Sequence, residues 1–199
     1  PEPLGAGGSV ARGYTGSQVF HTYNSTTESS EPNHCGVIGG ASQWFSYLAL
    51  TNGLLTITTD GSDFDTILGV YTGSELNFAS LKQIACDNDG GLDGKDSRVA
   101  FQAVAGTLYL IVVDGVQGAK GTAKLNYNLN RPPALQVTRA NNQMQMRLSG
   151  DAQGTFTVQS SNNLRDWTTL MTTNAPTGTV EWSSRGVGAA LYYRALQIN

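Results

Sequence analysis

The stretch QWFSYLALTNGLLTITTDGSDFDTILGVYT, residues 43–72, decides the fold class of this 199-residue chain. Apolar and polar residues alternate in short runs, and Thr-Asn-Gly at 51–53 and Asp-Gly at 60–61 separate these runs. Alternation with a period of two is typical of half-buried β-strands, and recurrent glycine turns leave no room for long helices. We therefore expect strands at residues 43–50, 54–59 and 66–72 in an all-β protein.

The same alternation continues on both sides of this stretch. It predicts five further strands before residue 130 and six after it, at residues 19–24, 81–86, 98–104, 107–114, 122–129, 135–139, 143–148, 155–160, 167–172, 179–183 and 191–198. Between the two groups lies Asn-Arg-Pro-Pro at 130–133, and consecutive prolines favour an extended linker over a strand ladder. We therefore predict an extended, glycine-rich N-terminal segment at 1–18, a jelly-roll β-sandwich at 19–131 and a smaller β-sandwich at 132–199.

Composition excludes several classes of function. The pI is about 5.2 and the basic residues are scattered, which argues against nucleic acid as a partner. The longest apolar run, residues 108–113, is far shorter than the roughly 20 residues of a membrane-spanning helix. Only His21 and His34 are present, so the usual catalytic constellations lack their base, and we predict no catalytic residues and no enzyme. A chain that begins at Pro1 predicts a processed product or an excised fragment.

Cys35 and Cys86 are the only cysteines. An even count in a strand-rich chain predicts one disulfide in an oxidising compartment, and the alternative is two free buried thiols. A catalytic Cys35 would need a base opposite its thiol, and the side chain of its neighbour His34 diverges from it in extended backbone.

An acidic loop follows Cys86. It combines four carboxylates with one amide oxygen, and a second acidic element lies at residues 60–65. Oxygen ligands at this density suit calcium, although the spacing is not that of an EF-hand. The alternative is a set of ordinary Asp-rich turns that bond their own backbone. The predicted calcium ligands are Asp87, Asn88, Asp89, Asp93, Asp96, Asp63 and Asp65.

Three other features of the sequence are candidate sites. Asn24-Ser25-Thr26 is a glycosylation sequon in a Ser/Thr-rich stretch, which fits an exposed extracellular loop. Paired carboxylates hydrolyse glycosides, but no apolar pocket flanks these acidic turns to raise a carboxyl pKa. A sugar-stacking platform is a further alternative to burial in the core for the aromatic residues Trp44, Phe45, Tyr47, Trp167, Trp182, Tyr192 and Tyr193.

Five motifs, in order, carry a family resemblance: EPNHCGVIGGASQWF at 31–45, GSDFDTILGVYTG at 61–73, DNDGG at 87–91, SRVAF at 97–101 and YLIVVDG at 109–115. Across residues 17–130 the chain resembles the bacterial pre-peptidase C-terminal-like family. The resemblance implies a secreted, non-catalytic jelly-roll module that accompanies extracellular enzymes and is often stabilised by calcium, with the family's acidic loop falling on Asp87, Asn88 and Asp89. Residues 133–199, with FTVQSSNNLRDW at 156–167 and LYYRA at 191–195, resemble small fibronectin type III-like (immunoglobulin-like) domains.

These observations lead to two hypotheses of function. The first is a non-catalytic secreted or cell-surface structural protein, in which residues 1–18 add a strand to the small sandwich of a neighbouring copy and build a fibre. The core-poor N-terminal segment and the six-strand sandwich with open edges motivate it. The alternative is a carbohydrate-binding or substrate-targeting accessory module of a secreted hydrolase, with a glycan as partner. Burial of all three tryptophans would count against that alternative.

Overall fold

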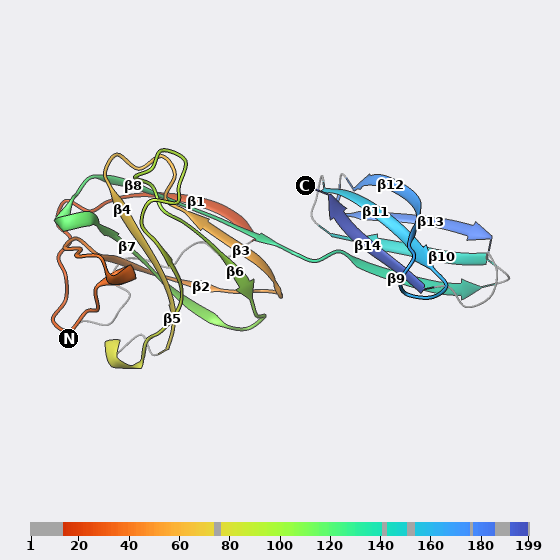
Figure 1. The fold of residues 1–199 in the computed structure, drawn as a ribbon, viewed down its shortest axis with the longest axis horizontal. Coiled ribbons are helices and arrows are strands. Elements are labelled where there is room, and N and C mark those ends of the chain that lie inside the picture. Colours follow the sequence, from red (N-terminus) through yellow and green to blue (C-terminus); the bar gives the residue numbers. More distant parts are fainter. Residues whose placement is uncertain are drawn as a thin grey trace. The chain divides into compact units, whose positions relative to one another are not determined.

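The computed structural model describes residues 14–73, 77–140, 143–150, 154–175, 177–185 and 192–198. The chain divides into two compact units, Pro1–Asn130 and Arg131–Asn199, which meet one residue before the boundary predicted from the prolines. Both units are built from antiparallel β-sheets, so the predicted all-β class is confirmed (Figure 1).

The N-terminal unit consists of two four-stranded sheets. One sheet has the order β1 (Thr15–His21), β8 (Thr122–Asn130), β3 (Gly53–Thr58) and β6 (Arg98–Ala103). The other has the order β2 (Gln43–Leu48), β7 (Leu108–Gly115), β4 (Thr66–Thr72) and β5 (Lys82–Asp87). Each sheet therefore alternates strands from the beginning and the end of the unit, which is the arrangement of a jelly roll.

The main core of this unit lies between its two sheets. Inward-facing residues at every second strand position fill it, among them the fully buried Phe45, Leu55, Ile57, Leu68 and Ile111. A second, smaller cluster lies on the other face of β2, β4 and β7, where Trp44, Tyr71, Leu110 and Val112 pack together. Strands β4 and β7 are thus apolar on both faces. Chain segments that lie outside the two sheets cover the outer face of these strands.

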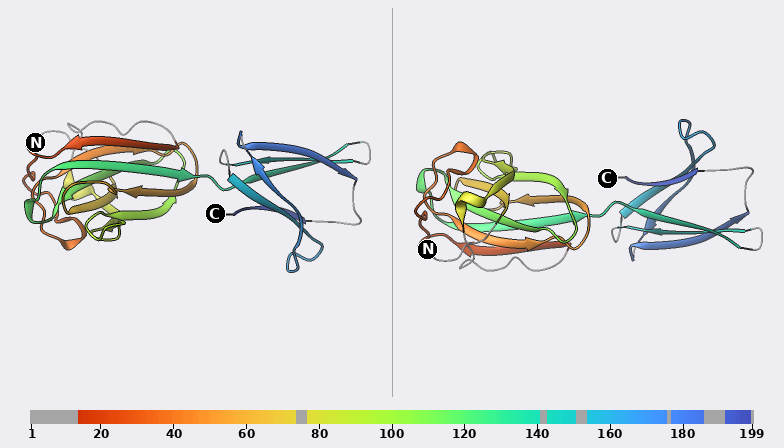
Figure 2. Two further views of the ribbon diagram at one scale, coloured as in Figure 1. Left: turned by 90° about the horizontal axis from the view of Figure 1, so that it is seen from above. Right: turned by 90° about the horizontal axis from the view of Figure 1, so that it is seen from below.

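The C-terminal unit is a six-stranded sandwich of two three-stranded sheets (Figure 2). One sheet has the order β13 (Thr179–Arg185), β10 (Gln143–Ser149) and β9 (Ala134–Ala140), and the other has the order β12 (Thr168–Ala175), β11 (Gly154–Ser161) and β14 (Tyr192–Ile198). Leu148, Phe156, Val158 and Ala175 form its small buried core. This is the immunoglobulin- or fibronectin-like sandwich expected for the second part of the chain.

The fourteen predicted strands all occur, with ends that shift by a few residues. The largest shift is at β1, which was expected at 19–24 and begins at Thr15, because residues 15–18 pair with residues 125–128 of β8. In the part of the chain that the structure describes, the loops contain three short 3-10 helices, at His34–Gly36, Phe78–Ser80 and Val116–Gly118. None of the helices in the described ranges has the length and apolar character to span a bilayer. Residues 1–13 of the predicted docking segment lie outside the described residues.

Candidate functional site

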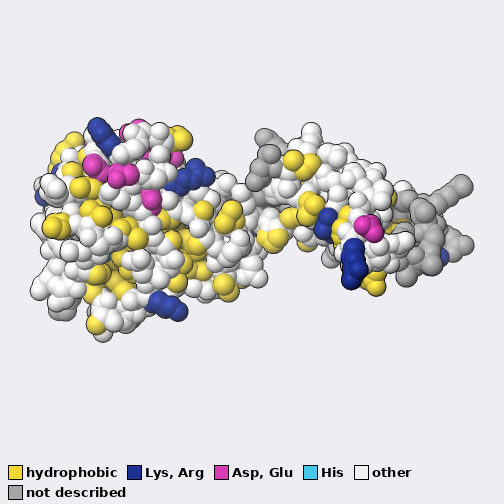
Figure 3. Space-filling view, viewed as in Figure 1, with side chains coloured by type: hydrophobic (Ala, Val, Ile, Leu, Met, Phe, Trp, Pro, Cys, Tyr) yellow, Lys and Arg dark blue, Asp and Glu magenta, His cyan; other side chains and the backbone are white. Residues whose placement is uncertain are grey.

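On the face drawn in Figure 3, acidic side chains gather over the loops that follow β3 and β5 of the N-terminal unit. Backbone bonds hold these loops together, since the amide of Thr66 donates to the carbonyl of Lys95 and the amide of Thr59 donates to that of Ser97. The hydroxyl oxygen of Ser97 lies 2.7 Å from the carbonyl oxygen of Thr66 and 2.9 Å from that of Asn88, within reach of its single proton. The fold therefore brings the two acidic elements of the sequence to one end of the jelly roll.

Two of the predicted ligands bond the backbone of their own loop. Asp87 Oδ2 accepts from the amides of Gly90 and Arg98, at 2.7 and 2.8 Å. Asp93 Oδ1 accepts from the amides of Asp96 and Lys95, and these bonds lower the pKa of Asp93. Asp87 and Asp93 thus behave as Asp-rich turns do, which is the alternative raised for this loop.

Three other side chains in these loops keep a buried oxygen without a hydrogen-bond donor: Asp65 Oδ1, Asn88 Oδ1 and Asp96 Oδ1. Asp96 is only 3% exposed, and its other oxygen accepts from the amide of Gly61 at 2.8 Å. A buried polar atom that lacks a partner is costly, so such atoms call for an explanation such as a bound ion or water.

The pKa of Asp65 and that of Asp96 are both raised. Burial is the main cause for Asp65. The negative charges of Asp89 and Asp93 raise its pKa further, and the positive charge of Lys95 lowers it in part. For Asp96, burial again dominates, the Gly61 amide opposes it, and Asp93 and Asp60 raise the pKa. Each of these two carboxylates therefore meets repulsion from other acidic side chains in a partly buried place, which a cation would relieve.

The remaining predicted ligands lie as follows. Asp89 Oδ2 accepts from Asn88 Nδ2 at 2.8 Å, and the charge of Asp89 raises the pKa of Asp65, so Asp89, Asn88 and Asp65 form one group. Asp63 does not join it, because Asp63 Oδ1 accepts from the amide of Thr122 at the start of β8. Among the described residues, no three His, Cys, Asp or Glu side chains form a preformed metal cage. The remaining ligands of a calcium ion here would be amide and backbone oxygens, which calcium accepts.

Cys35 and Cys86 form the predicted disulfide, with a Cα–Cα distance of 5.5 Å. The bridge joins the 3-10 helix at His34–Gly36 to strand β5, directly before the acidic loop. Cys35 has a φ of +55°, a left-handed conformation that few residues other than glycine adopt. The disulfide thus ties the segment before β2 to the edge of the sheet.

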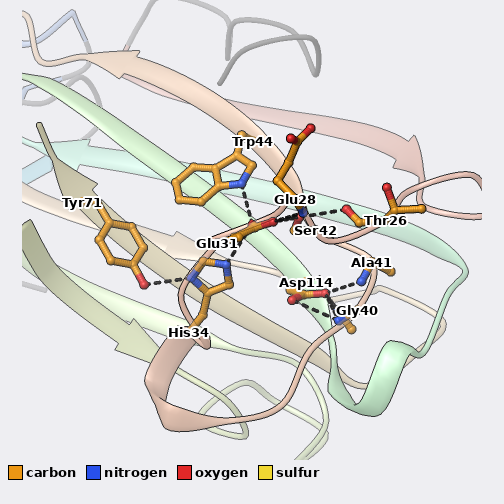
Figure 4. A network of polar contacts seen from close by, with 11 residues as sticks. Thr26, Glu28, Glu31, His34, Gly40, Ala41, Ser42, Trp44, Tyr71 and Asp114 are labelled. Atoms are coloured by element: carbon orange, nitrogen blue, oxygen red, sulfur yellow. Dashed lines mark hydrogen bonds and ion pairs between the residues drawn. The ribbon is translucent and has the colours of Figure 1, made fainter. Parts of the chain in front are cut away.

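A network of polar contacts around Glu31 lies beneath that segment (Figure 4). The Glu31 carboxylate is fully buried, and it accepts hydrogen bonds from Trp44 Nε1 at 2.7 Å, Ser42 Oγ at 2.9 Å and the amide of Glu28 at 2.8 Å. His34 Nε2 lies 3.2 Å from the same carboxylate, and His34 Nδ1 lies 2.8 Å from the Tyr71 hydroxyl. Sequence reasoning missed this network, since its members come from separate parts of the chain.

The network resembles a catalytic relay in composition, but its place in the fold argues for a structural role. His34 is 1% exposed and Tyr71 is 4% exposed, so a substrate has no access to either group. Burial raises the pKa of Tyr71 to about 12, and the charge of Glu31 adds to the rise, which is the opposite of an activated nucleophile. The network fastens the loop before β2 to the outer face of the sheet.

The other sequence candidates lie at the surface. His21, the second histidine, is exposed on β1 and stacks on Tyr23. Its Nδ1 lies 3.2 Å from Thr122 Oγ1. Asn24 of the sequon is exposed in the turn that follows β1. Glycosylation of Asn24 therefore stays a prediction that its exposure permits.

The aromatic residues are mostly structural. Trp44, Phe45 and Tyr47 are buried, Trp182 packs against the core of the C-terminal unit, and Tyr193 donates to Met144 Sδ. Trp167 is partly exposed, but the Arg194 guanidinium lies over its ring at 4.1 Å, and Tyr192 is 47% exposed. The three tryptophans are thus not all buried, yet they form no open stacking platform among the described residues.

Comparison with known proteins leaves the family open. No family model matches the sequence, and no curated protein matches it. The resemblance to the pre-peptidase C-terminal-like family therefore stays a prediction.

Solved structures with some similarity include three glycoside-cleaving enzymes. They are a GH2 β-galacturonidase from Eisenbergiella tayi (TM-score 0.32, 8% identity, 84% of this chain and 36% of that one), a β-glucuronidase from Ruminococcus gnavus (0.26, 10%, 96% and 46%) and a β-D-glucuronidase from Dictyoglomus thermophilum (0.27, 8%, 81% and 36%). The chain spans less than half the length of each. Similarity this low carries no argument about function.

Proposed function

We propose that the protein is a non-catalytic accessory module of a larger secreted protein, stabilised outside the cell by its disulfide and by a calcium ion in the acidic loops. The unpartnered buried oxygens of Asp65, Asn88 and Asp96 support the calcium ion in this proposal. The Cys35–Cys86 bridge supports the extracellular location, because disulfides persist mainly in oxidising compartments.

The loop residues fit calcium by their chemistry. Two carboxylates and one amide contribute unsatisfied hard oxygens, and Asp89 adds a negative charge beside Asp65. A bound Ca²⁺ would neutralise this repulsion and join the loop after β3 to the loop after β5. Asp87 and Asp93 already accept hydrogen bonds from backbone amides of the loop. They would therefore fix the shape of the loop, and the neighbouring residues would bind the ion.

Thermal unfolding in EGTA and in Ca²⁺ tests the proposal. A ligand at a hundred times its Kd stabilises the folded state by about 2.7 kcal/mol, so we expect Ca²⁺ to raise the Tm of the N-terminal unit by roughly 5 to 10 °C. Asp65→Asn removes a buried charge, so the variant should melt higher than the wild type in EGTA and should gain little from Ca²⁺.

The matched control is Asp63→Asn, which changes the same chemical group two residues away. Its carboxylate bonds the Thr122 amide, so we expect a lower Tm in EGTA and an undiminished Ca²⁺ response. A wild-type Tm that is the same in EGTA and in Ca²⁺ would refute the calcium site.

The fibre hypothesis remains a separate prediction. Residues 15–18, the end of the proposed docking segment, pair within their own unit with β8, and residues 1–13 lie outside the described residues. Strand addition to a neighbour would therefore have to use residues before 14 while β1 stays paired. The four outer strands β9, β13, β12 and β14 of the C-terminal unit offer edges for it.

A further inference from the structure

The outer face of the sheet formed by β13, β10 and β9 carries a trough of about 450 Å³. Its lining comes from two adjacent rows across the three strands. One row is Thr138, Gln145 and Ser183, and the other is Gln136, Arg147 and Glu181. Met146 and Trp182, which pack inward against the core, lie between the rows.

The residue sizes explain why this sheet face is hollow. Thr138 and Ser183 are short, whereas Gln136, Arg147 and Glu181 in the next row are long and stand beside them. Arg147 Nε and Glu181 Oε1 lie 3.4 Å apart, and both side chains are more than half exposed. An exposed ion pair adds little stability, so the fold does not need this pair.

We propose that this trough binds a neutral polyhydroxylated chain, that is, an oligosaccharide. The proposal names the ligand of the accessory module inferred above and rests on that inference. Two amides and two hydroxyls offer both donors and acceptors, as sugar hydroxyl groups require. Arg147 and Glu181 cancel in charge while offering directional bonds, and the volume falls within the range of about 300 to 1,000 Å³ of ligand pockets.

Other classes of ligand fit the trough less well. A peptide that adds a strand needs free backbone groups at a sheet edge, but β10 is the central strand and is bonded to β9 and β13 on its two sides. Nucleic acid needs several cationic groups to hold its phosphates, and the trough has one arginine, which is paired with a carboxylate. An acidic glycan would be attracted by Arg147 but repelled by Glu181, so its charge would gain little from this trough.

Affinity gel electrophoresis of the full chain tests the proposal. The probes are the neutral polysaccharides hydroxyethylcellulose, xylan, galactomannan and glycogen and the acidic polysaccharides pectate and alginate. We expect retardation by at least one neutral probe and by neither acidic one. Gln145→Ala and Gln136→Ala should each weaken binding about tenfold, the effect of one well-made hydrogen bond. Both residues are exposed, so the variants should fold, and circular dichroism checks this.

The matched control is Gln143→Ala. Gln143 lies on the same strand and the same face, one row beyond the trough, so its loss should change affinity by less than twofold. Binding that survives Gln145→Ala and Gln136→Ala would move the glycan site elsewhere and overturn this proposal. Retardation by no neutral probe, or by acidic probes alone, would overturn it as well. The acidic loops lie in the other unit, so the Ca²⁺ response of the Tm stands or fails separately.

Discussion

Glu31→Ala is expected to lower the free energy of unfolding of the N-terminal unit by about 4 kcal/mol, in the range found when one partner of a buried charged network is removed. The substitution leaves Trp44 Nε1, Ser42 Oγ and His34 without their buried acceptor. Urea unfolding followed by tryptophan fluorescence measures the effect in a Trp167→Phe, Trp182→Phe background, in which Trp44 is the one remaining tryptophan and reports on this unit.

Two further variants sharpen this prediction. Glu31→Gln keeps the shape but turns an NH₂ group toward hydrogen-bond donors, so we expect a smaller loss that is still well above 1 kcal/mol. Glu28→Ala is the matched control, because Glu28 is exposed and contributes to the network through its backbone amide. A change of about 0.5 kcal/mol or less is expected there. If Glu31→Ala lowered the free energy of unfolding no more than Glu28→Ala does, the network would not stabilise the N-terminal unit.

The same carboxylate predicts an acid dependence. Burial alone would raise the pKa of Glu31, but hydrogen bonds from His34, the Glu28 amide, Ser42 and Trp44 outweigh it, so the pKa lies below its usual value of 4.5. A carboxyl with a lowered folded-state pKa stabilises the fold above its unfolded pKa and loses that contribution as the pH falls through the folded value. The wild type should therefore lose stability below about pH 4.5, and Glu31→Gln should lose less over the same range.

Removal of the disulfide is the second prediction with a large effect. The bridge spans 51 residues, and the chain-entropy model assigns a loop of that length about 4 kcal/mol of stabilisation. The double variant Cys35→Ser, Cys86→Ser should lose most of this, and reduction of the wild type should give the same curve. The bridge also holds the loop that carries Glu31, so part of the loss should overlap with that of Glu31→Ala.

The C-terminal unit provides an internal control for the disulfide. Trp167 and Trp182 report its unfolding, and the bridge lies entirely within the other unit. The transition of the C-terminal unit should therefore keep its midpoint in the double variant and under reduction. Identical stability of the N-terminal unit with and without the bridge would contradict the prediction.

Much of the fold followed from the sequence, because the strands have clear period-two patterns and glycine turns between them. The sequence predicts both ends of strand β4 correctly, at residues 66 and 72, because Asp65 and Gly73 bound its apolar run. Residues 15–18 were missed, because Gly16 and short polar side chains gave no apolar signal. They belong to β1 only through their pairing with β8, more than a hundred residues away.

The candidate sites were predicted less completely. Composition alone located the acidic loop. Asp63 and Asp65 face different partners because the chain bends at residues 63 and 64, so the regular alternation of a strand does not apply there. Glu31 follows a Ser/Thr-rich stretch whose composition predicts an exposed loop, and nothing in the local sequence marks Glu31 as buried. The polar trough depends on strand register, which brings Gln145 beside Thr138 and Ser183 from separate hairpins.

The pairing of the first strand with the last has a consequence for how the N-terminal unit folds. Thr15 meets Asn128 across the sheet, and β8 also supplies the partner for β3. Neither β1 nor β3 can complete its ladder on a growing chain until residues 122–130 have been synthesised. Contacts this distant in sequence slow folding, whereas the C-terminal unit has two local hairpins, β9–β10 and β11–β12. The larger unit should therefore fold more slowly, and only after residues 122–130 have been made.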